Sequence, residues 1–407
     1  MRRLIPIIAA SVIFMSVTPS PGARAADQAK SASASSPLRK EAIPWSKKMQ
    51  ELYKTLADLL TDVTSDKRFY DSANRYRIEN EAGKIAELAH DLNKKGMVSV
   101  DTDPTIQIVA GMLGSETRRA VFELKRNNLA YARTILRSVP SYCIACHTRN
   151  ATGPQFAELR LEPGNSSMTA VERGEFFAAS RQFDRAQNEF MRVIKDPKMA
   201  KPYRMDWERA VRYGLAIAVR VKQDPAQAEE IVDTLLSPST ATPVSMREDA
   251  KVWKTSIQEW KEEQPRRANT EEGLHAEALR LMSRAREVQK YPMDRTADID
   301  YLRASAAAHD LLQTAPQGVH VGDGLLLAGL SYEILSPLRG EDLHDVYYEA
   351  CVRKVPHTAT AELCYRRYEQ SVFMAFGGNS GYDVPEDTLV RLIELRLMSE
   401  PTPAVKN

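Results

Sequence analysis

Apolar residues recur at three- and four-residue steps along most of the chain, which is the pattern of amphipathic helices. Within residues 45–63 the apolar positions are Met49, Leu52, Leu56, Leu59 and Leu60. The same spacing continues through residues 72–95, through residues 103–124, and from residue 129 onward. We therefore predict four helices joined by short connections, which fold as an up-down-up-down bundle.

Turn-forming residues gather between residues 150 and 167, where Gly153-Pro154 and Pro163-Gly164-Asn165 interrupt the helical pattern. Clusters of glycine and proline of this kind mark loops and domain boundaries. We therefore expect a linker over residues 153–167. It separates a first domain over residues 42–152 from a second domain over residues 168–400.

The second domain is expected to consist of repeated helical hairpins. Its first hairpin resembles a tetratricopeptide repeat in the spacing of Gly174, Phe177, Phe183, Ala186 and Phe190, closed by Pro197. Two antiparallel helices need small residues where their backbones meet and large residues that fill the remaining gap. Residues 224–236, 304–316 and 329–332 carry parts of the same pattern. We expect an α-solenoid, with a generic array of helical hairpins as the alternative.

The composition agrees with an all-α fold. The chain of 407 residues has only 18 glycines and 7% aromatic residues, and its length suits two or three domains. A formal charge of +2, from 56 Lys+Arg and 54 Asp+Glu, lacks the basic excess of a nucleic-acid binder. Nucleic acid is therefore not an expected partner.

The first 25 residues have the order of a secretory signal peptide. Arg2 and Arg3 precede an apolar run over residues 4–17, and Ala23-Arg24-Ala25 provides a cleavage site after Ala25. A membrane anchor is the alternative, but this run is shorter than the roughly 20 residues that span a bilayer. We expect a cleaved signal peptide over residues 1–25, a flexible leader over residues 26–41 and a tail over residues 401–407. The mature chain then has a formal charge of −1, no transmembrane segment and a periplasmic location.

The chain contains one C-x-x-C-H motif, formed by Cys143, Cys146 and His147. This is the attachment signature of haem c, in which two thiols add to the vinyl groups of the porphyrin and the histidine binds the iron. The alternatives are a thioredoxin-like redox pair, which needs a βαβ context, and a zinc site, which needs further ligands nearby. We therefore predict one covalent haem c, with His147 as the proximal ligand.

Four helices that end in this motif resemble the class II cytochromes, the cytochrome c prime group. The resemblance covers residues 42–152, and Pro140 departs from it because proline is expected to kink or restart the last helix. A class I cytochrome is the alternative scaffold, with Met199 or Met205 as the distal ligand. By the class II resemblance, the first helix supplies a distal methionine, here Met49. The alternatives are that Met49 only lines the core or that the distal site is open.

Cys351 and Cys364 flank Pro356-His357-Thr358, which we interpret as the turn of a helical hairpin. In an oxidising compartment we expect a disulfide between these cysteines. The histidines outside the motif show no ligand spacing, and we interpret them as structural or solvent-facing: His275, His309, His320, His344 and His357.

Two functions follow from the motif. The first is electron transfer, with the repeat domain docking a redox partner. The second is binding or sensing of NO or CO at a five-coordinate iron. No nucleophile–base pair or phosphate loop is visible, so we expect no enzyme. The class II resemblance also implies a homodimer as one alternative for the oligomeric state.

Overall fold

The computed structural model describes residues 38–92, 103–151, 167–201, 204–263, 269–292, 294–335, 343–378 and 381–400. These residues form helices, apart from loops and one antiparallel pair of two-residue strands, β1 (Gly377–Gly378) and β2 (Gly381–Tyr382). The prediction of an all-α fold is confirmed. No helix in the described ranges has the length and apolarity needed to cross a bilayer. The signal peptide, most of the leader and linker, and the tail lie outside the described residues.

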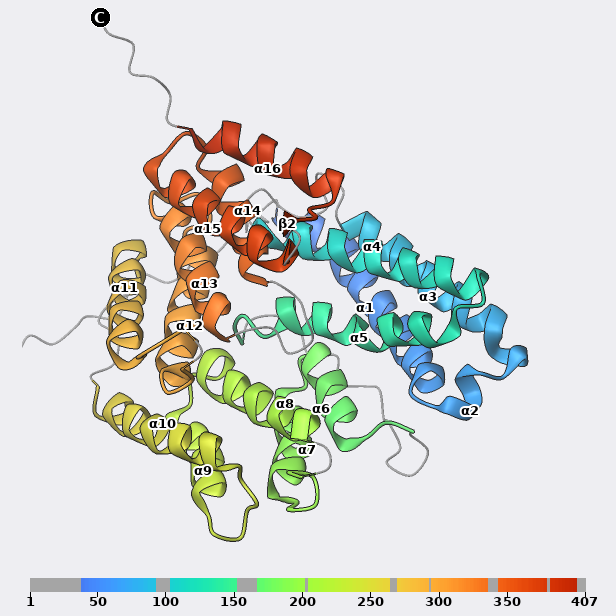
Figure 1. Ribbon diagram of the computed structural model, residues 1–407, viewed down its shortest axis with the longest axis horizontal. Coiled ribbons are helices and arrows are strands. Elements are labelled where there is room, and N and C mark those ends of the chain that lie inside the picture. The colour runs from blue at the N-terminus through green and yellow to red at the C-terminus, as the bar shows by residue number, and fades with distance from the viewer. Residues whose placement is uncertain are drawn as a thin grey trace, which may run out of the picture.

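The first four long helices are α1 (Leu38–Val63), α3 (Arg75–Leu92), α4 (Thr105–Lys125) and α5 (Leu129–His147). A short helix α2 (Asp66–Phe69) and a 3-10 turn η1 (Ser72–Asn74) connect α1 to α3. Helix α1 packs on α3 and α5, and α4 packs on α3 and α5 (Figure 1). Helix α1 therefore begins inside the segment that we predicted as a flexible leader.

The predicted apolar positions form the core of these helices. Leu52, Leu56, Leu59 and Leu60 of α1 are at most 7% exposed. Helix α5 continues through Pro140, so the expected restart at this residue does not occur. The ring of Pro140 is itself buried, and burial of apolar surface offsets part of the cost of the missing backbone N–H.

The first hairpin of the second region is formed by α6 (Ala170–Ala179) and α7 (Phe183–Lys195). Gly174 lies where the two helices approach most closely, because a Cβ at this position would lie 2.4 Å from the ring of Phe190. Gly329 meets Tyr348 at the same distance farther along the chain. These contacts explain the spacing of small and large residues that the sequence shows.

Nine further helical elements follow in the described chain before α16. They are α8 (Arg204–Leu215), the π-helical turn η2 (Ala216–Val221), α9 (Pro225–Leu236), α10 (Val244–Glu262), α11 (Glu271–Val288), α12 (Asp298–Thr314), α13 (Val321–Leu335), α14 (Leu343–Lys354) and α15 (Ala359–Phe376). The last helix is α16 (Glu386–Ser399). Most consecutive helices pack against each other, and α14 returns to contact α4 (Figure 1). Residues of α6, η2 and α14 contact the C-terminal end of α5 and the residues that directly follow it.

One large apolar core includes residues on both sides of the predicted linker, from Leu52 in α1 to Ile257 in α10. A second core extends from Ala278 in α11 to Leu395 in α16. The bundle and the first hairpins therefore share buried apolar surface. The domain boundary over residues 153–167 remains a prediction.

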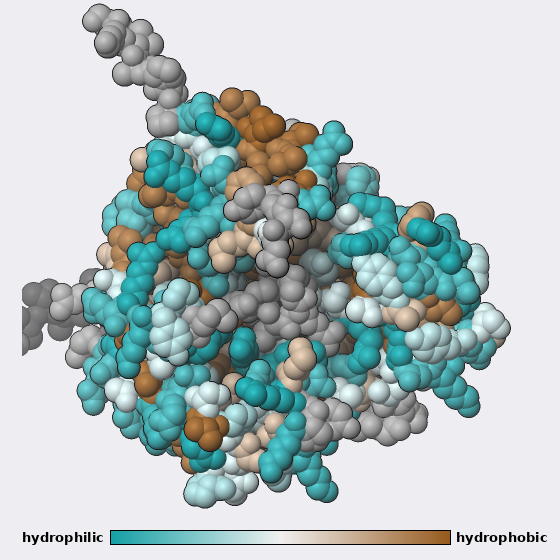
Figure 2. Space-filling view, in the orientation of Figure 1, coloured by the Kyte–Doolittle hydropathy of each residue, from teal (hydrophilic) through white to brown (hydrophobic). Residues whose placement is uncertain are grey.

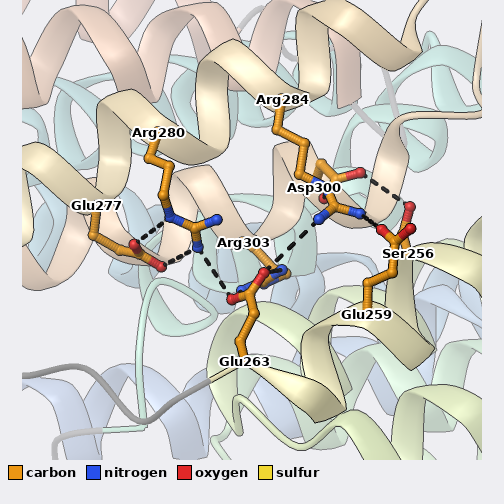
Figure 3. Close-up of polar contacts among 8 residues, drawn as sticks. All are labelled: Ser256, Glu259, Glu263, Glu277, Arg280, Arg284, Asp300 and Arg303. Atoms are coloured by element: carbon orange, nitrogen blue, oxygen red, sulfur yellow. Dashed lines mark hydrogen bonds and ion pairs between the residues drawn. The ribbon is translucent and has the colours of Figure 1, made fainter.

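An ion-pair network joins α10, α11 and α12 (Figure 3). The fully buried carboxylate of Asp300 contacts Arg284 Nε at 2.9 Å and accepts a hydrogen bond from Ser256 Oγ at 3.1 Å. Glu263, directly after α10, accepts hydrogen bonds from Arg280 and Arg303, each at 3.1 Å. These charges fix the relative positions of the three helices.

Cys351 of α14 and Cys364 of α15 form a disulfide, with their Cα atoms 6.2 Å apart. Both side chains are fully buried. The prediction of a disulfide that joins the two legs of a helical hairpin is confirmed.

Candidate functional site

The cysteine motif occupies the last turn of α5. Cys143 and Cys146 are three residues apart and His147 follows directly, so the three side chains share one face of the helix. All three residues are partly buried, and the intervening Ile144 and Ala145 are fully buried in the core. The helix therefore presents two thiols and one imidazole side by side at its end.

The imidazole of His147 is held by the second region of the chain. Its Nδ1 makes a hydrogen bond to the backbone carbonyl of Ala179, at the end of α6. Because a carbonyl oxygen only accepts, Nδ1 carries the proton and the lone pair of the neutral ring lies on Nε2. Burial, reinforced by the charges of Arg181 and Arg149, lowers the pKa of His147 to about 4. The ring is thus neutral at pH 7, which is the form that binds a metal.

Two buried arginines cap the C-terminal end of α5. Arg181 donates to the carbonyl of His147 at 3.0 Å and to that of Asn150 at 3.2 Å. Arg220, from η2, donates to the carbonyl and the hydroxyl of Thr148 at 2.8 and 2.9 Å. Each arginine is 6% exposed. These groups satisfy terminal carbonyls and place positive charge at the negative end of the helix dipole.

A third buried arginine, Arg149, connects the motif to α4 and α14. Its Nη1 donates to Asp103 Oδ2 at 2.6 Å, and its guanidinium lies 5.5 Å from the centre of the Tyr347 ring. Asp103 precedes α4 and also accepts from the N–H of Thr105 at 2.9 Å, which fixes the start of that helix. Arg149 therefore ties the end of the cysteine motif to the start of α4 and to α14.

A buried polar cluster completes this side of the site. The rings of Tyr332 and Tyr347 stack with centroids 5.1 Å apart, and His309 Nε2 lies 3.0 Å from the hydroxyl of Tyr332. Neither His309 Nδ1 nor the hydroxyl of Tyr347 has a hydrogen-bond partner within the described chain. Arg149 is paired with Asp103, whereas Arg220 lies over the Tyr332 ring and forms no ion pair with a described residue, so the described part of the cluster carries an excess of positive charge. This combination suits an anionic group with oxygen acceptors.

Met49 lies on the face of α1 that is directed toward α6. It is one turn from Tyr53, whose ring stacks on Phe176 at 5.5 Å and whose hydroxyl accepts from Gln182 at 3.2 Å. Met49 is partly buried and packs against the same core as Cys143 and Cys146. Its role as a distal ligand remains a prediction.

The two methionines of the class I alternative differ in exposure. Met205 is 79% exposed, so its thioether lies at the surface. Met199 is partly buried and packs against the core. Of these two, only Met199 has the burial that an axial ligand requires.

Two of the remaining histidines lie next to each other. His275 and His320, which are far apart in sequence, stack with ring centroids 3.9 Å apart and form a group with Asp323 that has the donor atoms for a metal ion. The interpretation of all five histidines as structural or solvent-facing remains a prediction. His309 is buried, His344 Nε2 lies 2.9 Å from Ser371 Oγ, and His357 Nδ1 contacts the carbonyl of Glu400.

No protein-family model matches the chain, and comparisons with curated proteins and with solved structures also give no match. The functional argument therefore depends on the chemistry of the site itself.

Proposed function

We propose that the protein is an exported monohaem c-type cytochrome that transfers electrons, with a class II-like haem domain and a helical-repeat region. The observation that carries the proposal is the arrangement at the end of α5. Two thiols and a neutral imidazole share one face there, and the hydrogen bond to the carbonyl of Ala179 leaves the Nε2 lone pair of His147 available to a metal. Metal-binding histidines commonly have such a second hydrogen bond.

The side chains around the motif have distinct roles in this proposal. Cys143 and Cys146 form the two thioether bonds, and His147 Nε2 binds the iron. Haem c supplies a one-electron Fe(III)/Fe(II) couple when bound. The buried guanidinium groups of Arg149 and Arg220 offer charge compensation for the two haem carboxylates, and these cations favour the reduced form.

The helical-repeat region has two functions in this account. Its inner elements enclose the end of α5 and limit the access of water to the motif, since α6, η2 and α14 all contribute contacts there.

The outer elements of the helical-repeat region provide a surface for a redox partner. A supporting feature is the apolar face of α16, seen in brown near the top of Figure 2, which contains Leu389, Val390, Ile393 and Leu397, each at least 42% exposed. Exposed apolar surface of this extent is typical of protein interaction sites.

The proposed periplasmic location agrees with the buried disulfide between Cys351 and Cys364, because such bonds persist in oxidising compartments. The same compartment is where haem c is attached. Within this proposal the chain has no catalytic residue. The oligomeric state is a separate question, for which α16 also offers a surface for a second copy.

The experiment that tests the function is the absorption spectrum of the exported protein, oxidised and reduced, with and without CO. Electron transfer predicts sharp low-spin bands that do not respond to CO, because both axial positions are filled. A high-spin spectrum that shifts with CO would contradict electron transfer and support NO or CO binding at an open distal site.

A pair of methionine variants identifies the distal ligand. Met49→Leu keeps the side-chain volume but removes the thioether, so we expect conversion from six-coordinate to five-coordinate iron. Met112→Leu is the matched control, because Met112 of α4 is also partly buried against the same core. Unchanged bands in Met49→Leu would assign the distal position to another residue.

A further inference from the structure

A second group of metal-binding side chains lies away from the cysteine motif, at the start of α13. His275 comes from α11, His320 directly precedes α13, and Asp323 lies in the first turn of α13. One donor atom from each residue lies within 4.8 Å of the other two. All three residues are partly buried.

The two imidazoles lie face to face. Their rings are nearly parallel, at an interplanar angle of 15° and with centroids 3.9 Å apart. A neutral imidazole has a lone pair available to a metal ion.

The distances within the group fit the ligands of one ion. Asp323 Oδ2 lies 3.2 Å from His275 Nε2 and 3.7 Å from His320 Nδ1. A tetrahedral ion with bonds of 2.0–2.1 Å places its ligands about 3.3 Å apart. His275 Nε2 is a buried nitrogen that faces this carboxylate oxygen.

Neighbouring residues hold these ligands in place. Thr360 Oγ1 donates to Asp323 Oδ1 at 3.1 Å, which leaves Oδ2 directed at the histidines. Glu271 Oε1 accepts from the backbone N–H of His320 at 2.8 Å and adds a second negative charge. A Cβ on Gly318 would lie 2.2 Å from this carboxylate, so the glycine permits the approach. Metal sites commonly have such outer partners, which orient the ligands.

We propose that His275, His320 and Asp323 bind one divalent transition-metal ion of the zinc class. Two imidazoles and one carboxylate are a ligand set that zinc uses, and three protein ligands leave one position for water or a small ligand. The ion would join α11 to α13. The site shares no residue with the cysteine motif, so it does not depend on the proposed haem.

The test is a calorimetric titration of Zn²⁺ into tag-free, full-length protein from which a chelator has removed metals. We expect one Zn²⁺ per chain. His275→Gln and Asp323→Asn should each weaken the affinity for Zn²⁺ by more than about 100-fold. Thr360→Val should weaken it by about 10-fold, because removal of a residue that orients a metal ligand lowers metal affinity by ~10–100-fold. His90→Gln is the control, because His90 is exposed on α3 and should not alter binding. Circular dichroism verifies that each variant is folded.

Two results would overturn the proposal. The first is the absence of zinc binding by the folded wild-type protein. The second is an equal number of bound Zn²⁺ ions per chain in the wild type and in the folded double variant His275→Gln/His320→Gln. This result would place the ion elsewhere, for instance at a cysteine motif that lacks haem. The haem spectrum of the same samples reports on the proposed function separately.

Discussion

The buried ion pair between Arg149 and Asp103 joins the residues that follow the cysteine motif to the start of α4. The side chains are 6% and 12% exposed, and the two atoms lie 2.6 Å apart. Asp103→Asn removes the negative charge but keeps an oxygen that can accept from the N–H of Thr105, so the start of α4 is preserved. The substitution therefore tests the loss of the negative charge separately from the loss of the helix cap.

The expected cost follows from the surroundings of Arg149. Removing one partner of a buried pair costs about 3–5 kcal/mol, because the other charge remains uncompensated. Arg149 retains the carbonyl of Ala145 at 3.2 Å and the ring of Tyr347, which moderate the loss. We expect a destabilisation of about 3 kcal/mol, which is roughly a 100-fold change in the ratio of folded to unfolded protein.

Urea unfolding at pH 7, followed by far-ultraviolet circular dichroism, measures this cost. The control is Glu230→Gln, because Lys195 and Glu230 form a 3.5 Å pair with side chains 56% and 63% exposed. Such a surface pair contributes less than about 1 kcal/mol. Arg149→Met/Asp103→Asn should be more stable than Asp103→Asn alone. The reasoning is refuted if Asp103→Asn costs no more than Glu230→Gln.

Two further predictions concern stability. Burial, with the charges of Asp62 and Asp58, raises the pKa of Glu81 to about 7, so the folded state binds its proton more tightly than the unfolded state does. The free energy of unfolding should therefore fall by at most about 3 kcal/mol as the pH rises from about 4.5 through 7, and Glu81→Gln should remove this part of the loss. A difference in unfolding free energy between the wild type and Glu81→Gln that stays constant with pH would contradict this prediction. Replacing both Cys351 and Cys364 by alanine should destabilise the chain by about 3 kcal/mol in denaturant unfolding, because the disulfide closes a loop over a sequence separation of 13 residues. Equal denaturant midpoints for the oxidised wild type and this variant would contradict this prediction.

The features that the sequence predicted are those with local causes. Helix positions follow from apolar spacing, and the approach of Gly174 to Phe190 follows from small and large residues within one hairpin. The disulfide was predictable because Cys351 and Cys364 flank a single turn. Pro140 shows where a local rule was too strict, because α5 continues through this residue without the restart that the sequence suggested.

Contacts between distant segments were not predictable in this way. The capping of Thr148 by Arg220 and the stacking of His275 on His320 depend on how the helices curve back on one another. Apolar spacing determines which face of a helix is buried, but it does not determine which distant helix that face meets. The hydrogen bond between His147 and Ala179 belongs to the same class, and it is the contact that orients the proposed iron ligand.

The most direct test of the central claim is whether haem stays on the chain when the exported protein is extracted with acidified acetone. The protein should be produced together with the haem-attachment machinery. The account predicts that the wild type retains one haem after extraction and that Cys143→Ala/Cys146→Ala retains none, since thioether bonds survive acid and non-covalent haem does not. Retention of haem by the double variant, or a wild type that carries no haem, would contradict it.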